Sequence, residues 1–206
     1  RNATLEEADA LAKEVAKTVG EQYGIPCFLY ESSATAPHRA NLASIRKGQF
    51  EGMAEKMQDT EKWAPDFGPA APHPTAGVSA VGARMPLVAY NVNLGTDNLE
   101  IANQIARRVR NINGGYHYIK AIGVMLEGRN VALVSMNLTN FVKTPIYYAF
   151  ELTRQLADRY GARIIGSEVV GLTPAKALLD CAEFYLKLEN YDCRKQVMEY
   201  HLIGME

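Results

Sequence analysis

The chain has 206 residues, of which 48% are hydrophobic and 22% are charged, a composition typical of a folded globular protein with one large or two small domains. Its 22 basic and 23 acidic side chains leave a formal net charge of −1, which excludes a global attraction to nucleic acid or to an anionic membrane. The sequence has no apolar run of about 18 residues and no apolar run after a basic N-terminus, so we expect neither a membrane span nor a signal peptide.

The cysteines indicate a reducing environment. The sequence has three of them, Cys27, Cys181 and Cys193, an odd number without the spacing of a metal site. They lie in apolar or helical segments, which predicts free thiols and a cytoplasmic protein. We expect no bound metal.

The first part of the chain predicts two or three helices and one strand. Thr4 and Glu7 have the spacing of a capping box, and apolar residues recur at helical intervals until Gly24. Residues 25–30 form a short apolar run that predicts a buried strand, and residues 38–58 look helical. Because a lone strand cannot satisfy its own backbone groups, we expect its partners to come from a segment upstream of residue 1.

Residues 64–82 are predicted to form a long loop. Four prolines and three glycines lie there, and the apolar residues show no periodicity. Loops longer than about 12 to 15 residues are uncommon in a compact fold and are usually functional or disordered. A stiff loop with small side chains lets backbone amides approach a flat ligand closely. The pattern also fits a second interpretation, an interdomain linker that binds nothing.

From residue 84 onward six elements follow in the order strand, helix, strand, strand, helix, strand. The strands are expected at residues 84–94, 118–126, 131–138 and 163–170. Asp97 with Glu100 is expected to cap the first helix, and Thr144 with Pro145 to open the second, which Gly161 closes. This is the split βαβ pattern, in which two helices pack on one face of a four-stranded sheet. A further helix is expected from Thr173 to about residue 188, followed by a helical tail from residue 194.

These elements predict an α/β (α+β) protein of two subdomains. The second is expected to be a ferredoxin-like βαββαβ unit with helices packed on one face of a mixed sheet.

His73 in the long loop is a candidate for acid–base chemistry, because imidazole titrates near neutral pH. The sequence supplies no partner for it, so an exposed or ligand-stacking histidine is the alternative. His38, His117 and His201 have no ligand-like spacing and are expected at the surface. We find no metal motif and no nucleophile motif.

Polar residues alternate along two predicted strands. Asn91 and Asn93 are two residues apart and share one face of their strand, as do Ser135 and Asn137 on theirs. Such a strip could bind a polar ligand. It could equally be the solvated face of an antiparallel sheet.

Six short motifs occur in one order along the chain. They are IRKGQFE at 45–51, WAPDFGP at 63–69, GVSAVGAR at 77–84, AYNVNL at 89–94, VSMNL at 134–138 and GSEVVGL at 166–172. Together they closely resemble the formiminotransferase domain of glutamate formimidoyltransferases. The joint occurrence of the motifs is specific, whereas each motif alone would be weak.

The resemblance implies two α/β subdomains with a folate-binding tunnel between them. Residues 1–83 would be the C-terminal part of the N-subdomain and residues 84–206 the C-subdomain. The implied reaction moves the formimino group from N-formimino-L-glutamate to N5 of tetrahydrofolate in histidine degradation. The implied partners are these small molecules and a second copy in a homodimer, with no nucleic acid and no membrane.

The family's general acid is a histidine in a Gly-Glu-His-Pro-Arg motif that this sequence does not contain. We therefore expect it upstream and assign no catalytic residue here. What the resemblance carries over is a folate-binding loop, which comprises Gly68, Pro69, Ala70, Ala71, Pro72, His73, Pro74, Thr75, Ala76 and Gly77.

Two alternatives stay open from the sequence. One is a non-catalytic module that binds folate or another small ligand, which the missing histidine motif favours. The other keeps the fold but transfers a formyl group from 5-formyltetrahydrofolate.

Overall fold

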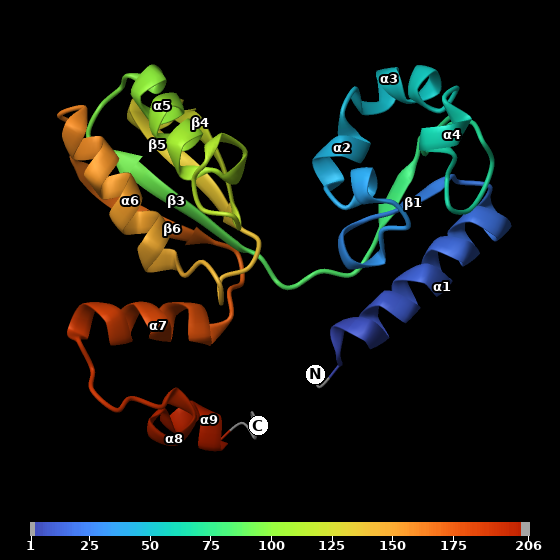
Figure 1. Ribbon diagram of the computed structural model, residues 1–206. Coiled ribbons are helices and arrows are strands. Elements are labelled where there is room, and N and C mark those ends of the chain that lie inside the picture. The colour runs from blue at the N-terminus through green and yellow to red at the C-terminus, as the bar shows by residue number, and fades with distance from the viewer. Residues whose placement is uncertain (1–2, 203–206) are drawn as a thin grey trace. The chain divides into compact units, whose positions relative to one another are not determined.

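The computed structural model describes residues 3–202. The chain divides into two compact units, Arg1–Met85 and Pro86–Glu206, and each is described here by itself (Figure 1). No helix within residues 3–202 is both long and apolar enough to cross a lipid bilayer.

The first unit begins with helix α1, Leu5–Tyr23. The Thr4 hydroxyl accepts a hydrogen bond from the Glu7 amide at 3.2 Å, and the Glu7 carboxylate accepts one from the Thr4 amide at 2.8 Å. Gly24 ends the helix with φ of 63°, in the left-handed region that glycine adopts without strain. The predicted capping box and helix end are therefore confirmed.

Strand β1, Cys27–Leu29, pairs in parallel with strand β2, Ser79–Val81. The sequence did not predict β2, because three residues next to a glycine are too few to show an alternating pattern. The other edge of β1 is also occupied. The Cys27 amide donates to the Phe67 carbonyl at 2.8 Å, and the Asp66 amide donates to the Cys27 carbonyl at 2.9 Å. The sequence analysis expected the partners of β1 from an upstream segment, but residues distant in this chain supply partners on both of its edges.

The segment predicted as helical at 38–58 is helical but interrupted. Gly48, with φ of 93°, lies between the two longer helices of this segment, α2 Leu42–Arg46 and α3 Gln49–Lys56. The Lys56 ammonium bridges the interruption by donating to the carbonyls of Ser44, Ile45 and Lys47 at 2.6, 2.8 and 3.1 Å. The short helices of this unit are η1 Glu31–Ser33, η2 Pro37–Arg39, α2 Leu42–Arg46, α3 Gln49–Lys56 and α4 Thr60–Trp63.

The second unit has the predicted order βαββαβ. Its elements are β3 Val88–Leu94, α5 Leu99–Val109, β4 Ile119–Leu126, β5 Val131–Leu138, α6 Ile146–Arg159 and β6 Ile164–Val170. Asn98 rather than Asp97 caps α5, and Pro145 rather than Thr144 occupies the cap position of α6. Short turns η3 Asn111–Asn113 and η4 Glu127–Arg129 flank β4.

The sheet of the second unit has the order β4-β5-β3-β6, and every neighbouring pair is antiparallel. The expectation of a mixed sheet was therefore wrong in this respect. Each helix connection links two parallel strands, but it skips one position in the sheet. A strand of opposite direction fills the skipped position, so no parallel pair forms.

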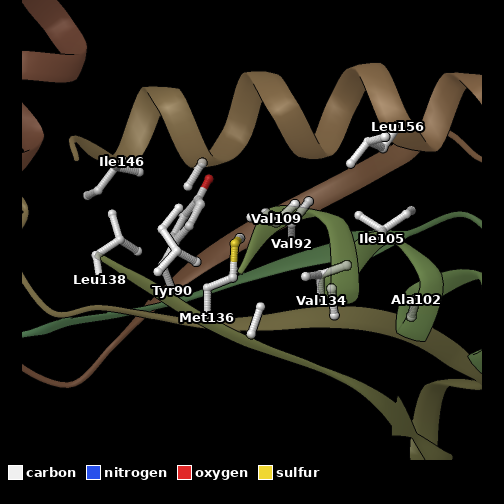
Figure 2. Close-up of a cluster of buried hydrophobic side chains, with 14 of the residues drawn as sticks. Tyr90, Val92, Ala102, Ile105, Val109, Val134, Met136, Leu138, Ile146 and Leu156 are labelled. Atoms are coloured by element: carbon white, nitrogen blue, oxygen red, sulfur yellow. The ribbon is translucent and has the colours of Figure 1, made fainter. Parts of the chain in front are cut away.

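Helices α5 and α6 cover one face of this sheet, as Figure 2 shows for the core side chains. The residues of β3 that point to the helices, Val88, Tyr90, Val92 and Leu94, are buried. The intervening residues lie on the helix-free face. Such alternation follows from the two-residue period of a strand.

Three helices follow the sheet. They are α7 Ala175–Leu186, α8 Cys193–Gln196 and α9 Met198–Leu202. The prediction of a helix after Thr173 is confirmed, and so is that of a helical tail as far as residue 202, with a break at Val197 between the last two helices. The rest of the predicted tail, residues 203–206, lies outside the described residues.

The two faces of β4 make a matched stability test. Ile119 is 1% exposed, whereas Ile122 on the same strand is 59% exposed. We expect Ile119→Ala to lower the free energy of unfolding by about 2 to 5 kcal/mol, because the substitution leaves a cavity in the core. Ile122→Ala should lower it by less than about 1 kcal/mol, since little buried surface is lost. A larger loss for Ile122→Ala than for Ile119→Ala in chemical denaturation would show that the sheet faces the other way.

Candidate functional site

The long loop is attached to the first unit through the Asp66 side chain. Asp66 Oδ2 accepts a hydrogen bond from Arg39 Nη1 at 2.9 Å, and each side chain is 8% exposed. The same oxygen accepts from the Leu29 amide at 2.8 Å, and Oδ1 accepts from the Thr35 hydroxyl. One buried carboxylate therefore joins β1, the segment before α2 and the start of the loop.

Arg39 holds the opposite side of this junction. Its Nη2 donates to the carbonyls of Ala64 and Lys62 at 2.6 and 3.2 Å, and its guanidinium lies 5.4 Å from the centroid of the Phe28 ring. A guanidinium has several fixed donors, which lets a single side chain satisfy a carboxylate and two carbonyls together. The backbone before the loop is thus fixed by a side chain that the loop does not contain.

Two glycines allow the loop to start against helix α1. A Cβ atom on Gly20 would lie 2.7 Å from the Gly68 amide nitrogen, and a Cβ atom on Gly68 would lie 2.9 Å from the Ile25 carbonyl oxygen. Gly68 also has φ of 89°. Both positions therefore exclude larger side chains, and the loop leaves the α1 surface at a fixed place.

Residues 73–77 of the loop form a small hairpin. The amides of His73 and Gly77 each donate to the carbonyl of the other residue at 2.8 Å. His73 Nδ1 accepts hydrogen bonds from the Thr75 and Ala76 amides at 3.3 and 3.1 Å. These contacts require Nδ1 to be unprotonated, which assigns the proton of the neutral ring to Nε2. His73 thus shapes the loop with one nitrogen and keeps the other as a donor.

An aromatic ring lies beside Gly77, the last residue of the folate-binding loop expected at residues 68–77. Gly77 has φ of 68°, and a Cβ atom there would lie 3.0 Å from Phe50 Cδ2. Phe50 is 55% exposed, although it is a large apolar side chain. The sequence analysis did not identify Phe50 as a site residue, because its closeness to the loop depends on the fold.

The surroundings of the other histidines and of the buried cysteine favour structural roles for these side chains. His38 Nε2 lies 2.8 Å from the Lys62 carbonyl, and His201 Nε2 lies 3.1 Å from the Lys195 carbonyl. Burial, and then the negative charge of Asp66, raise the pKa of the Cys27 thiol, which argues against a nucleophilic role. Within residues 3–202, no group of three or more His, Cys, Asp and Glu side chains could hold a metal ion.

The second unit carries a polar strip on the helix-free face of its sheet. We use this name for Asn91, Asn93, Ser135, Asn137 and Glu168. The strand register places Asn91 opposite Ser135 on one side and opposite Glu168 on the other. Asn91 Nδ2 donates to Glu168 Oε1 at 2.9 Å. The predicted pairs of polar residues therefore do share a face, and the structure adds Glu168 to them.

The Asp66 ion pair yields a stability prediction. We expect Asp66→Asn to lower the free energy of unfolding of the first unit by about 3 to 5 kcal/mol, because the Arg39 charge stays buried without a counter-ion. Asp158→Asn is the control, since Asp158 is 62% exposed and lies 3.8 Å from Arg154. It should cost less than about 1 kcal/mol. Equal and small losses in chemical denaturation would show that the buried pair does not anchor the loop.

Comparison with known families covers nearly the whole chain. Residues 1–84 match the formiminotransferase domain, N-terminal subdomain, and residues 89–203 match the formiminotransferase domain. Among curated proteins, the glutamate formimidoyltransferase of Streptococcus pyogenes serotype M1 is 57% identical over 204 residues, which are 99% of this chain and 68% of the relative.

Other relatives are more distant. The glutamate formimidoyltransferase of Thermoplasma acidophilum is 46% identical over 91% of this chain and 62% of its own length. The formimidoyltransferase-cyclodeaminase of Gallus gallus is 38% identical over 91% of this chain, which spans 36% of that longer protein. All three relatives are named as formimidoyltransferases. The chain belongs to the formiminotransferase family.

Proposed function

We propose that this chain is part of a glutamate formimidoyltransferase, which moves the formimino group from N-formimino-L-glutamate to N5 of tetrahydrofolate in histidine degradation. The observation that carries the proposal is the family match over residues 1–84 and 89–203. The chain spans 68% and 62% of the two microbial relatives of that name. The activity is accordingly proposed for the full-length protein.

Within this chain, we assign folate binding to residues 68–77 and place the join of the two subdomains at residue 84. The support is that the loop is anchored at both ends, by Gly68 against α1 and by the hairpin from His73 to Gly77. A preorganised loop loses little entropy when it binds. Phe50 would supply an aromatic surface for the flat pterin ring, since aromatic rings favour offset stacking.

The chemistry divides into binding and proton transfer. N5 of tetrahydrofolate attacks the amidine carbon and gives up its proton, and a tetrahedral intermediate forms. The bond from that carbon to the glutamate nitrogen then breaks as this nitrogen takes a proton, giving 5-formiminotetrahydrofolate and glutamate. The last step calls for a general acid. The family resemblance implies that this acid lies in a motif absent from this sequence, and His73 holds its own loop with Nδ1. We therefore assign to this chain the orientation of folate rather than the protonation.

Two further features stay predictions. A homodimer follows from the family resemblance alone, and a cytoplasmic location follows from the cysteine content. The three thiols are free in the structure. Sedimentation of the full-length protein would establish its oligomeric state.

The direct test is titration of the full-length protein with 5-formyltetrahydrofolate, followed by turnover of formiminoglutamate with tetrahydrofolate and of 5-formyltetrahydrofolate with glutamate. We expect saturable folate binding and faster consumption of formiminoglutamate than of the formyl donor. Folate binding without turnover would favour a non-catalytic binding module. Absence of both would contradict the proposal.

Substitution of Gly77 tests whether the loop backbone must stay close to the ligand. Gly77→Val should weaken folate binding by about tenfold or more, because valine disfavours the observed positive φ and its side chain would meet Phe50. Gly24→Val is the control, since Gly24 has φ of 63° but nothing within 4 Å of an added Cβ. Calorimetry on folded Gly77→Val protein with unchanged affinity would remove the loop from the site.

Variants of His73 separate its two nitrogens. His73→Asn keeps a side-chain oxygen that can accept the Thr75 and Ala76 amides, as asparagine does in turns. We expect it to retain folate affinity within about threefold, whereas His73→Leu should lose about tenfold because two amides lose their acceptor. If both variants lose affinity equally, Nε2 rather than loop shape is what the ligand requires.

A further inference from the structure

The polar strip contains a buried acceptor without a hydrogen-bond partner. Asn93 is 7% exposed, and its Oδ1 finds no donor among the residues that the structure describes. Its cross-strand neighbours are Leu133 and Gly166, which carry no side-chain donor. A buried unsatisfied oxygen opposes folding, and leucine in its place would remove that cost. A polar residue that occupies a buried position at such a cost is a candidate ligand-binding residue.

A negative charge lies next to this acceptor. Glu168 is exposed, and the Asn91 amide holds its Oε1 at 2.9 Å. Asn91 is opposite Glu168 in the sheet, and Asn93 is two residues further along the same strand, a separation of about 7 Å. The strip thus offers a carboxylate and an amide oxygen on one face. Two acceptors with one negative charge suit a ligand that is cationic and rich in N–H donors.

We propose that the polar strip binds the amidinium end of the formimino donor, with Glu168 as its counter-ion and Asn93 Oδ1 as a second acceptor. This inference rests on the proposed function. An amidine is a strong base that carries a proton at neutral pH, and its planar N–H groups match a carboxylate in the way a guanidinium does. The carboxylates of the donor are repelled by Glu168, so the strip binds the reacting end of that molecule.

The proposal also accounts for selection between donors. A formyl group has an oxygen where the formimino group has nitrogen, so it brings neither positive charge nor N–H donors to the strip. A site that hydrogen-bonds N–H groups rejects an analogue that lacks them, because its own buried polar groups are then left unpaired. Asn93 and Glu168 would therefore favour the formimino donor.

Glu168→Gln in the full-length protein is the first test. We expect the Kd for formiminoglutamate to rise about 10- to 100-fold, as for loss of a charge-assisted hydrogen bond. The Kd for 5-formyltetrahydrofolate should stay within about twofold of the wild-type value, because the folate loop is unchanged. Glu127→Gln is the matched control, since Glu127 is an exposed carboxylate in the η4 turn outside the strip. It should change neither constant.

Asn93→Leu is the second test. Its thermal stability and its KM, measured together, separate a ligand-binding role of Asn93 from a structural one. We expect the variant to be at least as stable as the wild type in thermal denaturation, because an unsatisfied oxygen is removed. Its KM for formiminoglutamate should nevertheless rise, with folate binding retained. Lower stability together with an unchanged KM would assign Asn93 a structural role and contradict the proposal.

The outcomes distinguish this proposal from the one on which it rests. If the wild type binds folate and consumes formiminoglutamate while Glu168→Gln leaves the donor Kd unchanged, the proposed function stands and the role of the strip is overturned. If the wild type binds no folate and consumes no donor, both proposals are overturned.

Discussion

The buried ion pair between Asp66 and Arg39 is the interaction on which the candidate folate site depends. The two side chains lie 2.9 Å apart and are almost fully excluded from solvent. Each also binds backbone, Asp66 on β1 and Arg39 on the segment that ends at Ala64. A buried pair is costly to desolvate, and further hydrogen bonds from both side chains offset part of that cost, although Arg39 Nε has no partner among the described residues. Here those bonds fix the point at which a proline-rich loop leaves the small β1–β2 sheet.

The two units contribute different kinds of recognition to the proposed reaction. The first offers a stiff loop that holds its own shape through His73 and glycine contacts, which suits a flat ligand. The second offers side chains on a sheet whose opposite face is filled by α5 and α6 (Figure 2). Because successive side chains of a strand point to opposite faces, one sheet can pack against helices on one face and present polar side chains on the other. The same strand β3 buries Val92 in the core and presents Asn91 on the other face.

Local signals in the sequence were sufficient for much of the fold. The capping box of α1, the β3–β6 strands and the split βαβ order all depend on residues close together in the chain. Strand β2 was missed because its three residues show no period, and the mixed sheet was wrong because strand direction depends on which position each connection skips. The segment expected to be helical at 38–58 is interrupted at Gly48, whose positive φ a periodic pattern does not reveal.

The candidate site was less accessible from sequence, because its key contacts join distant residues. Asp66 and Arg39 are 27 positions apart, and Asn91 and Glu168 are 77 apart. Asp66 stood inside a recognised motif without a visible partner. The paired asparagines of β3 were visible from their spacing, but neither the burial of Asn93 nor the presence of Glu168 beside Asn91 follows from local pattern.

Amide hydrogen exchange of the full-length protein, measured with and without saturating 5-formyltetrahydrofolate, tests the central claim most directly. Seven of the ten residues at 68–77 carry a backbone N–H, since the other three are prolines. The account predicts that folate slows exchange at these amides and leaves the core strands of the second unit unchanged. Saturable folate binding with no change in exchange at residues 68–77 would contradict it.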